Sequence, residues 1–120
     1  RPDDTAPLGL FGPTTLPDGD QVRWSTPEVT LSVPGTLDLV VLRIRNPAPF
    51  SRTVSVRVDG RPADEVTLAE TSAWRPLEYR LRRRDKTRRL DLHVSPPWSP
   101  AYDFRTIGVG VGDVEWLRPA

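Results

Sequence analysis

The chain has 120 residues, of which 14 are proline and 8 are glycine, and its formal net charge is +1. This length suits one domain, and the prolines disfavour long helices, because a proline inside a helix costs about 3 kcal/mol. The lack of cysteine excludes a disulfide framework, a thiolate zinc site and a cysteine nucleophile, and no apolar run approaches the ~20 residues that span a bilayer.

Residues 1–19 contain four prolines, and we expect them to form an extended lead-in that packs along the following domain or links it to a preceding one. Residues 20–120 form the predicted domain. The chain opens Arg1-Pro2-Asp3-Asp4, which is neither a translation start nor a signal peptide, so we interpret it as an excised domain or a processed product.

Apolar and polar residues alternate with period two along the rest of the chain, which is the pattern of a half-buried strand. Val54, Val56 and Val58, for example, alternate with Ser55 and Arg57. The pattern predicts about eight strands, at residues 22–25, 29–33, 39–45, 54–58, 66–68, 77–82, 89–95 and 109–116.

Turn residues separate these strands. Asp59-Gly60 predicts a two-residue hairpin turn, because such turns need positive φ. The basic segment 83–88 is expected to be the tip of a second hairpin, joining 77–82 to 89–95. Glycines 108, 110 and 112 lie within a predicted strand and indicate a bulge or the close approach of another backbone.

Short alternating strands with proline-rich connections predict an all-β domain with almost no helix, an antiparallel two-sheet β-sandwich. A closed barrel of similar size is the structural alternative. The side chains expected to be buried together are Trp24, Leu42, Val56, Leu92 and Val111, and Trp116 is also expected to be buried.

No residue pattern indicates an enzyme or a metal centre. His93 is the sole histidine, and alternation places it on the solvent-facing side of its strand, so neither a triad with Ser95 nor a zinc site is favoured. Asp18 and Asp20 have two interpretations: ligands of a structural calcium with loop carbonyls, or formers of a solvated turn. We expect no catalytic residue and no other cofactor.

Residues 80–89 hold seven basic residues and one acid, whereas the rest of the chain is mildly acidic. This segment could contact an anionic lipid surface or another anionic partner, or it could be a solvated turn. Nucleic acid is disfavoured because no aromatic residue for base stacking lies within the segment. The candidates for anionic-surface contact are Arg82, Arg83, Arg84, Lys86 and Arg88.

Four tryptophans in a small domain also suggest sugar binding, because a flat aromatic ring can stack on a pyranose. Trp98 lies in Ser-Pro-Pro-Trp-Ser-Pro, where prolines hold the loop extended, with Tyr102 nearby, and Trp74 precedes a predicted strand. The candidates for carbohydrate contact are therefore Trp98, Tyr102 and Trp74. The alternative for Trp98 is a loop tryptophan folded back over the core.

Residues 94–114 carry a sequence motif that resembles the ending of a group of β-sandwich segments. Ser95-x-x-Trp98-x-Pro100, followed by Asp103-x-Arg105-x-Ile107-Gly108-Val109-x-Val111, resembles the end of β-sandwich segments attached to bacterial membrane glycosyltransferases and other cell-envelope polysaccharide proteins. The hairpin at 54–62 resembles the "V-x-V-N-G-x-P" hairpin of galactose-binding-like jelly rolls. The resemblance implies a jelly-roll fold in an extracytoplasmic setting, periplasmic or at the cell surface, within a larger membrane-associated protein.

Two functions from different classes follow. The first is a non-catalytic carbohydrate-associated module, accessory to an envelope glycan-assembly protein, with a glycan or polysaccharide and a parent membrane-protein domain as partners. The second is a small interaction module that binds protein or anionic lipid through residues 80–89, without sugar affinity. A solvent-facing Trp98 ring beside a groove with polar groups favours the first function, and a buried Trp98 favours the second.

Overall fold

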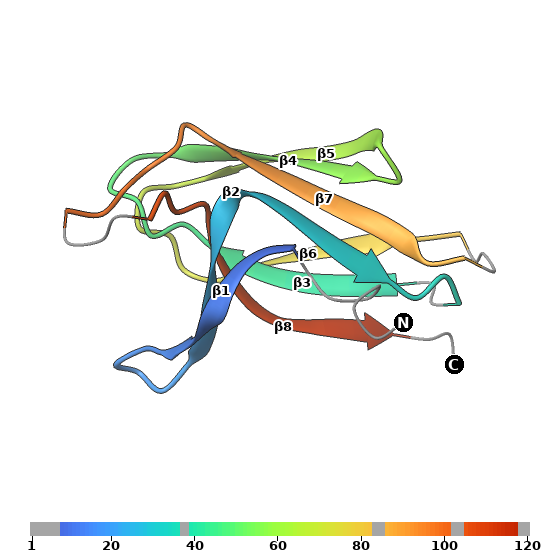
Figure 1. Ribbon diagram of the computed structural model, residues 1–120, viewed down its shortest axis with the longest axis horizontal. Coiled ribbons are helices and arrows are strands. Elements are labelled where there is room, and N and C mark those ends of the chain that lie inside the picture. The colour runs from blue at the N-terminus through green and yellow to red at the C-terminus, as the bar shows by residue number, and fades with distance from the viewer. Residues whose placement is uncertain (1–7, 37–38, 83–85, 102–104, 118–120) are drawn as a thin grey trace.

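The computed structural model describes residues 8–36, 39–82, 86–101 and 105–117, and for Leu8 and residues 113–117 it describes the backbone only. These residues form eight strands and no helix, which confirms the predicted all-β fold (Figure 1). The strands are β1 (Leu8–Thr15), β2 (Gln21–Val33), β3 (Leu39–Arg45), β4 (Arg52–Val58), β5 (Arg61–Leu68), β6 (Arg75–Arg80), β7 (Arg88–Ser95) and β8 (Gly110–Leu117).

The strands pair antiparallel in the order β5-β4-β7-β2-β8-β3-β6, with β1 beside β2. The sheet curls so that β5, β4 and β7 form one layer and β8, β3 and β6 the other (Figure 1). Within the described residues β5 and β6 end this order without pairing to each other, so the fold is a sandwich rather than a closed barrel. Buried apolar side chains from both layers form one core, including Val29, Leu42, Val56, Leu92 and Val111.

Strand β2 belongs to both layers. Its first part pairs with β8 through Arg23 and Trp24, and its second part, Glu28–Val33, pairs with β7. Two separate strands were predicted here, but the structure has one 13-residue strand that changes partners around Pro27. Proline lacks a backbone N–H donor, so it suits a position where one hydrogen-bonded ladder ends and another begins.

Trp24 corrects the prediction of the core. Alternation places it in phase with Val22, which is buried, but the Trp24 side chain is only partly buried. The alternation is interrupted one residue later, where Ser25 is buried instead. The hydroxyl of Ser25 accepts a hydrogen bond from the backbone N–H of Val109 at 2.9 Å, so polar pairing rather than apolar packing determines the inward face here. The side chain of Trp116 lies outside the described residues.

One of the two predicted hairpins exists. Strands β4 and β5 are joined by Asp59 and Gly60, whose φ angles are 52° and 83°, as the two-residue turn requires. The second prediction was wrong, because β6 pairs with β3 at the edge of one layer whereas β7 pairs with β4 and β2 in the other. Strands β6 and β7 therefore belong to different layers.

The glycine-rich stretch shows both features expected of it. A Cβ on Gly108 would lie 2.3 Å from the carbonyl oxygen of Thr26 and 2.6 Å from Oγ of Ser25, which is a close approach of another backbone. The register of β8 against β3 shifts between the pairs Ile44–Val111 and Leu42–Val114, which is an irregularity of the bulge type.

Candidate functional site

A cleft with a volume of about 210 Å³ lies between the loop after β7 and the first part of β2. Trp98 and Trp24 both line it, and both side chains are partly exposed. The lining is apolar except for one guanidinium group, and its residues are Trp24, Pro47, Trp98, Pro100, Arg105 and Ile107. Two aromatic rings beside a cation can provide stacking faces and hydrogen-bond donors to the same ligand.

The loop that carries Trp98 is held on both sides. The Ser95–Pro96 peptide bond that enters the loop is cis. The backbone N–H of Ile107 donates to the carbonyl of Trp98 at 2.7 Å, and the two residues form an isolated antiparallel bridge. The Trp98 backbone is therefore fixed against the returning segment, which limits the conformational entropy that a ligand would have to remove.

Arg52 fixes the base of this loop from within the sandwich. Its side chain is 1% exposed, and its guanidinium group donates to the carbonyls of Pro96, Ile107 and Gly108 at 2.9, 2.8 and 2.6 Å. Burial lowers the pKa of Arg52 from its ordinary value, because removal from water disfavours the charged form. Three carbonyl dipoles compensate that charge, and they belong to the two ends of the loop.

Sequence reasoning missed Arg52, although a signal for it exists. Arg52 is two residues before Val54 and four before Val56, so the alternation of β4 places it on the core side. A buried arginine in phase with valines requires hydrogen-bond acceptors, and backbone carbonyls of irregular segments are not used by strand pairing and can serve as those acceptors.

Arg105 was placed in the motif at 94–114, and its guanidinium group lies 4.5 Å from the centroid of the Phe11 ring.

Trp74 lies in a different hollow from Trp98. This hollow has a volume of about 110 Å³ and is lined by Asp20, Gln21, Arg43, Trp74 and Gly112. The indole Nε1–H of Trp74 donates to Oδ2 of Asp20 at 3.1 Å.

Arg45 contacts the Trp74 ring and lies beside Gly110, which the Trp24 ring also approaches. Its guanidinium carbon is 5.2 Å from the centroid of the Trp74 ring. A Cβ on Gly110 would lie 3.0 Å from Cγ of Arg45 and 2.9 Å from the Trp24 ring, so both side chains close over that glycine. The two hollows are thus neighbours on the β2-β8-β3 surface.

The remaining predicted site residues have mixed positions. Tyr102, Arg83 and Arg84 lie outside the described residues. Asp18 accepts the backbone N–H of Asp20 at 2.9 Å, as in a local turn. No group of three His, Cys, Asp or Glu side chains suited to a metal ion occurs in the part of the chain that the structure describes.

Arg88 differs from the other candidates in the basic segment. Arg82 and Lys86 are exposed, but Arg88 is 8% exposed, and its Nε lies 3.0 Å from Oδ2 of Asp59. Its Nη1 donates to the carbonyl of Arg82. These contacts hold the Arg88 side chain below the surface, unlike the exposed side chains of Arg82 and Lys86 with which it was grouped.

His93 lies on the outer face, as the alternation indicates. It is exposed, and its Nδ1 is 3.4 Å from Oε1 of Glu28 on the neighbouring strand. The shallow surface around it is lined by residues of β2, β4 and β7. Ser95, the residue considered as a nucleophile, is also exposed.

Solved structures with the same fold include carbohydrate-binding modules. A family 6 carbohydrate-binding module matches with a TM-score of 0.50 and 10% identity, over 93% of this chain and 84% of that one. An exo-β-1,3-galactanase from Phanerochaete chrysosporium, solved with β-1,3-galactotriose, matches with a TM-score of 0.50 and 14% identity, over 92% of this chain. The match covers 26% of the galactanase chain. These likenesses show the jelly-roll β-sandwich fold.

No family model matches the sequence, and no curated protein matches it significantly. Among the described residues, no helix has the length and apolar character needed to cross a membrane.

Proposed function

We propose that this chain is a non-catalytic carbohydrate-binding module that holds a glycan in the cleft between Trp98 and Trp24. The observation that carries the proposal is the pair of partly exposed tryptophans beside Arg105. The apolar face of a pyranose stacks on an indole, while guanidinium N–H groups donate to sugar hydroxyls. The cleft volume of about 210 Å³ is below the roughly 300–1,000 Å³ of typical ligand pockets, so the cleft would hold a short part of a longer glycan chain.

The way the loop is built supports ligand binding. Arg52 and the bridge between Trp98 and Ile107 hold the loop backbone before any ligand arrives. Two structures with the same fold also come from a carbohydrate-binding module and from an enzyme solved with an oligosaccharide.

We further propose a setting for the module. It is extracytoplasmic, at the periplasmic side or the cell surface, and is accessory to an envelope glycan-assembly protein with a membrane domain. The resemblance of residues 94–114 to segments attached to membrane glycosyltransferases supports this assignment. Membrane-spanning segments encoded in the same full-length gene product would support it, and a cytoplasmic parent protein would refute it.

The binding test uses affinity electrophoresis and tryptophan fluorescence with three probes: β-1,3-galactotriose, soluble xylan and arabinogalactan. We expect at least one probe to retard the protein and change its fluorescence. Trp98→Ala and Trp24→Ala should each weaken that binding at least tenfold, which is about 1.4 kcal/mol.

The matched control is Phe50→Ala, because Phe50 is an aromatic side chain that is 37% exposed and does not line the cleft. Its binding should equal that of the wild type. Trp74→Ala then reports whether the neighbouring hollow adds contacts. Equal weakening by Trp98→Ala and Phe50→Ala would refute the assignment of the cleft, and a wild type that binds no probe from a wider glycan array would refute the function.

A further inference from the structure

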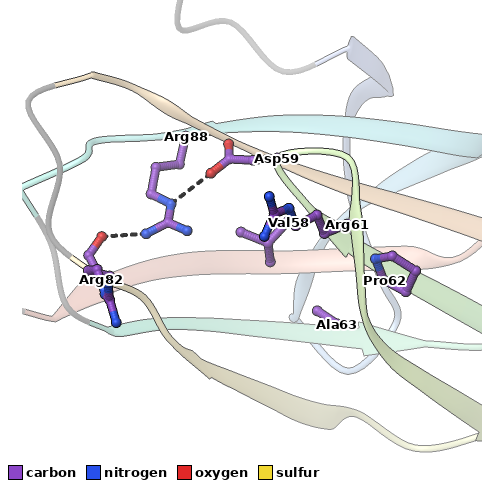
Figure 2. A pocket seen from close by; sticks show the side chains of 7 residues that line it. All are labelled: Val58, Asp59, Arg61, Pro62, Ala63, Arg82 and Arg88. Atoms are coloured by element: carbon purple, nitrogen blue, oxygen red, sulfur yellow. Dashed lines mark hydrogen bonds and ion pairs between the residues drawn. The ribbon is translucent and has the colours of Figure 1, made fainter.

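A larger hollow lies at the far end of β4 from the Trp98 loop. Arg52, at the start of β4, contacts that loop, whereas the hollow begins at Val58, where the strand ends. Six residue steps of a strand separate the two points by about 20 Å. The hollow has a volume of about 560 Å³ and is lined by Val58, Asp59, Arg61, Pro62, Ala63, Arg82 and Arg88 (Figure 2).

Arg88 is held in a fixed orientation inside this hollow. Its Nε pairs with Oδ2 of Asp59, and its Nη1 donates to the carbonyl of Arg82, as Figure 2 shows. Asp59 is in turn held by Arg89 of β7. The Oδ1 atom of Asp59 accepts a hydrogen bond from the backbone N–H of Arg89 at 2.9 Å, and the backbone N–H of Asp59 donates to the Arg89 carbonyl at 2.8 Å. Within the described residues, no protein atom accepts a hydrogen bond from Nη2 of Arg88.

Two further guanidinium groups line the hollow. Arg61 and Arg82 are exposed, and neither side chain makes an ion pair or a hydrogen bond with another described residue. Three arginines and one aspartate give the lining a net charge of +2. Such a grouping is repulsive unless an anion compensates it, and guanidinium groups match the oxygens of phosphate in charge and geometry.

We propose that this hollow binds a phosphate monoester group carried by a larger molecule. A phosphate monoester has a charge of about −1.5 to −2 at pH 7 and three acceptor oxygens. That charge matches the +2 of the lining, whereas a carboxylate or a sulfate ester supplies a single negative charge. The hollow is also larger than one phosphate group, and Val58, Pro62 and Ala63 leave part of its wall apolar for the attached group. The site is separate from the Trp98 cleft and does not depend on sugar binding there.

The test is calorimetric titration of the full chain with glycerol 3-phosphate and inorganic phosphate at pH 8 and constant ionic strength. Acetate and glucuronate serve as single-charge comparators. We expect both phosphates to bind more tightly than both comparators, and we expect binding to weaken as pH falls below the second pKa of the ester, about 6. Arg61→Gln and Arg82→Gln should each weaken binding at least tenfold. Neither should disturb the fold, because both side chains are exposed and make no ion pair or hydrogen bond with another described residue.

The matched control is Arg75→Gln, which removes the same charge from an exposed arginine at the start of β6 that does not line the hollow. Its binding should be unchanged. Equal affinities for acetate and phosphate would indicate non-specific attraction of anions to positive charge and would overturn the proposal. Weakening by Arg75→Gln equal to that by Arg61→Gln would overturn it for the same reason.

Vesicles identify the carrier of the phosphate. Preference for vesicles with phosphatidic acid, a monoester, over vesicles with phosphatidylglycerol of equal charge would assign a lipid headgroup. Binding of glycerol 3-phosphate without vesicle binding would assign a soluble or polymer-borne phosphate. Equal binding to both vesicle types, with no effect of Arg61→Gln, would count against the site. Arg61→Gln should leave the binding of the glycan probes unchanged, so failure of either proposal can be recognised separately.

Discussion

Replacement of Arg52 by methionine should destabilise the domain by about 3 kcal/mol. The substitution keeps most of the aliphatic stem and removes the donor of three hydrogen bonds. Ile107 and Gly108 are buried, so their carbonyls lose a partner away from water, at about 1–3 kcal/mol each, while the exposed Pro96 can be hydrated. Burying methionine instead of a cation offsets part of the loss. The net value is a large share of the ~5–15 kcal/mol typical of a domain.

The measurement is urea unfolding followed by tryptophan fluorescence, with thermal unfolding as a second readout, where the midpoint should fall by about 10–20 °C. Arg57→Met is the matched control, because Arg57 lies on the same strand but is exposed, and it should change stability by less than about 0.5 kcal/mol. Arg52→Lys should be intermediate in stability, since one ammonium cannot reach all three carbonyls. If Arg52→Met costs less than about 1 kcal/mol, the three contacts do not hold the loop as described.

Three further outcomes are expected. Leu92→Ala, or Leu42→Ala, should lower the free energy of unfolding in urea by about 2–5 kcal/mol, because both leucines are fully buried. A loss of less than about 1 kcal/mol at both sites would contradict the inward face assigned here. Gly108→Ala should cost at least about 1–3 kcal/mol, since its Cβ would lie 2.3 Å from a β2 carbonyl, whereas Gly12→Ala, with nothing within 4 Å, should be nearly neutral. Burial and the hydrogen bond to Asp64 raise the pKa of Tyr79. The native state therefore keeps the phenol protonated above pH ~10, where the unfolded chain ionises, so stability should fall as pH rises past 10, and Tyr79→Phe should reduce that fall. An identical fall in wild type and Tyr79→Phe between pH 9 and 11 would argue against this assignment.

Strand β1 lies in the segment that was expected to be a lead-in, but period-two alternation located the other strands, because each strand of a two-layer sandwich buries one face. It did not predict which strands pair. The Asp59-Gly60 hairpin was correct because a two-residue turn leaves the chain no choice of partner. Between β6 and β7 the connection spans residues 81–87, which is long enough to cross to the other layer, and the alternation of each strand is the same in either arrangement.

The candidate site was only partly predictable. Proline spacing indicated the loop that presents Trp98, because prolines restrict local backbone angles. Trp24 was assigned to the core because alternation assumes a straight strand, and β2 changes layers close to that residue. Arg52 was missed because its role depends on carbonyls 44–56 residues away in the chain.

The pairing of β2 with late strands determines when its sheet can form during synthesis. β2 ends at Val33, yet its two other partners, β7 and β8, are made from residues 88 and 110 onwards. Such distant contacts slow folding, because the loops they close cost entropy before the contacts form. At a synthesis rate of ~5–20 residues per second, β7 and β8 are made several seconds after β2, and until then β1 is the only pairing partner of β2 that has been made. The polar residues on β2, among them Arg23, Thr26, Glu28 and Thr30, then help to keep an incomplete sheet edge from pairing with other chains.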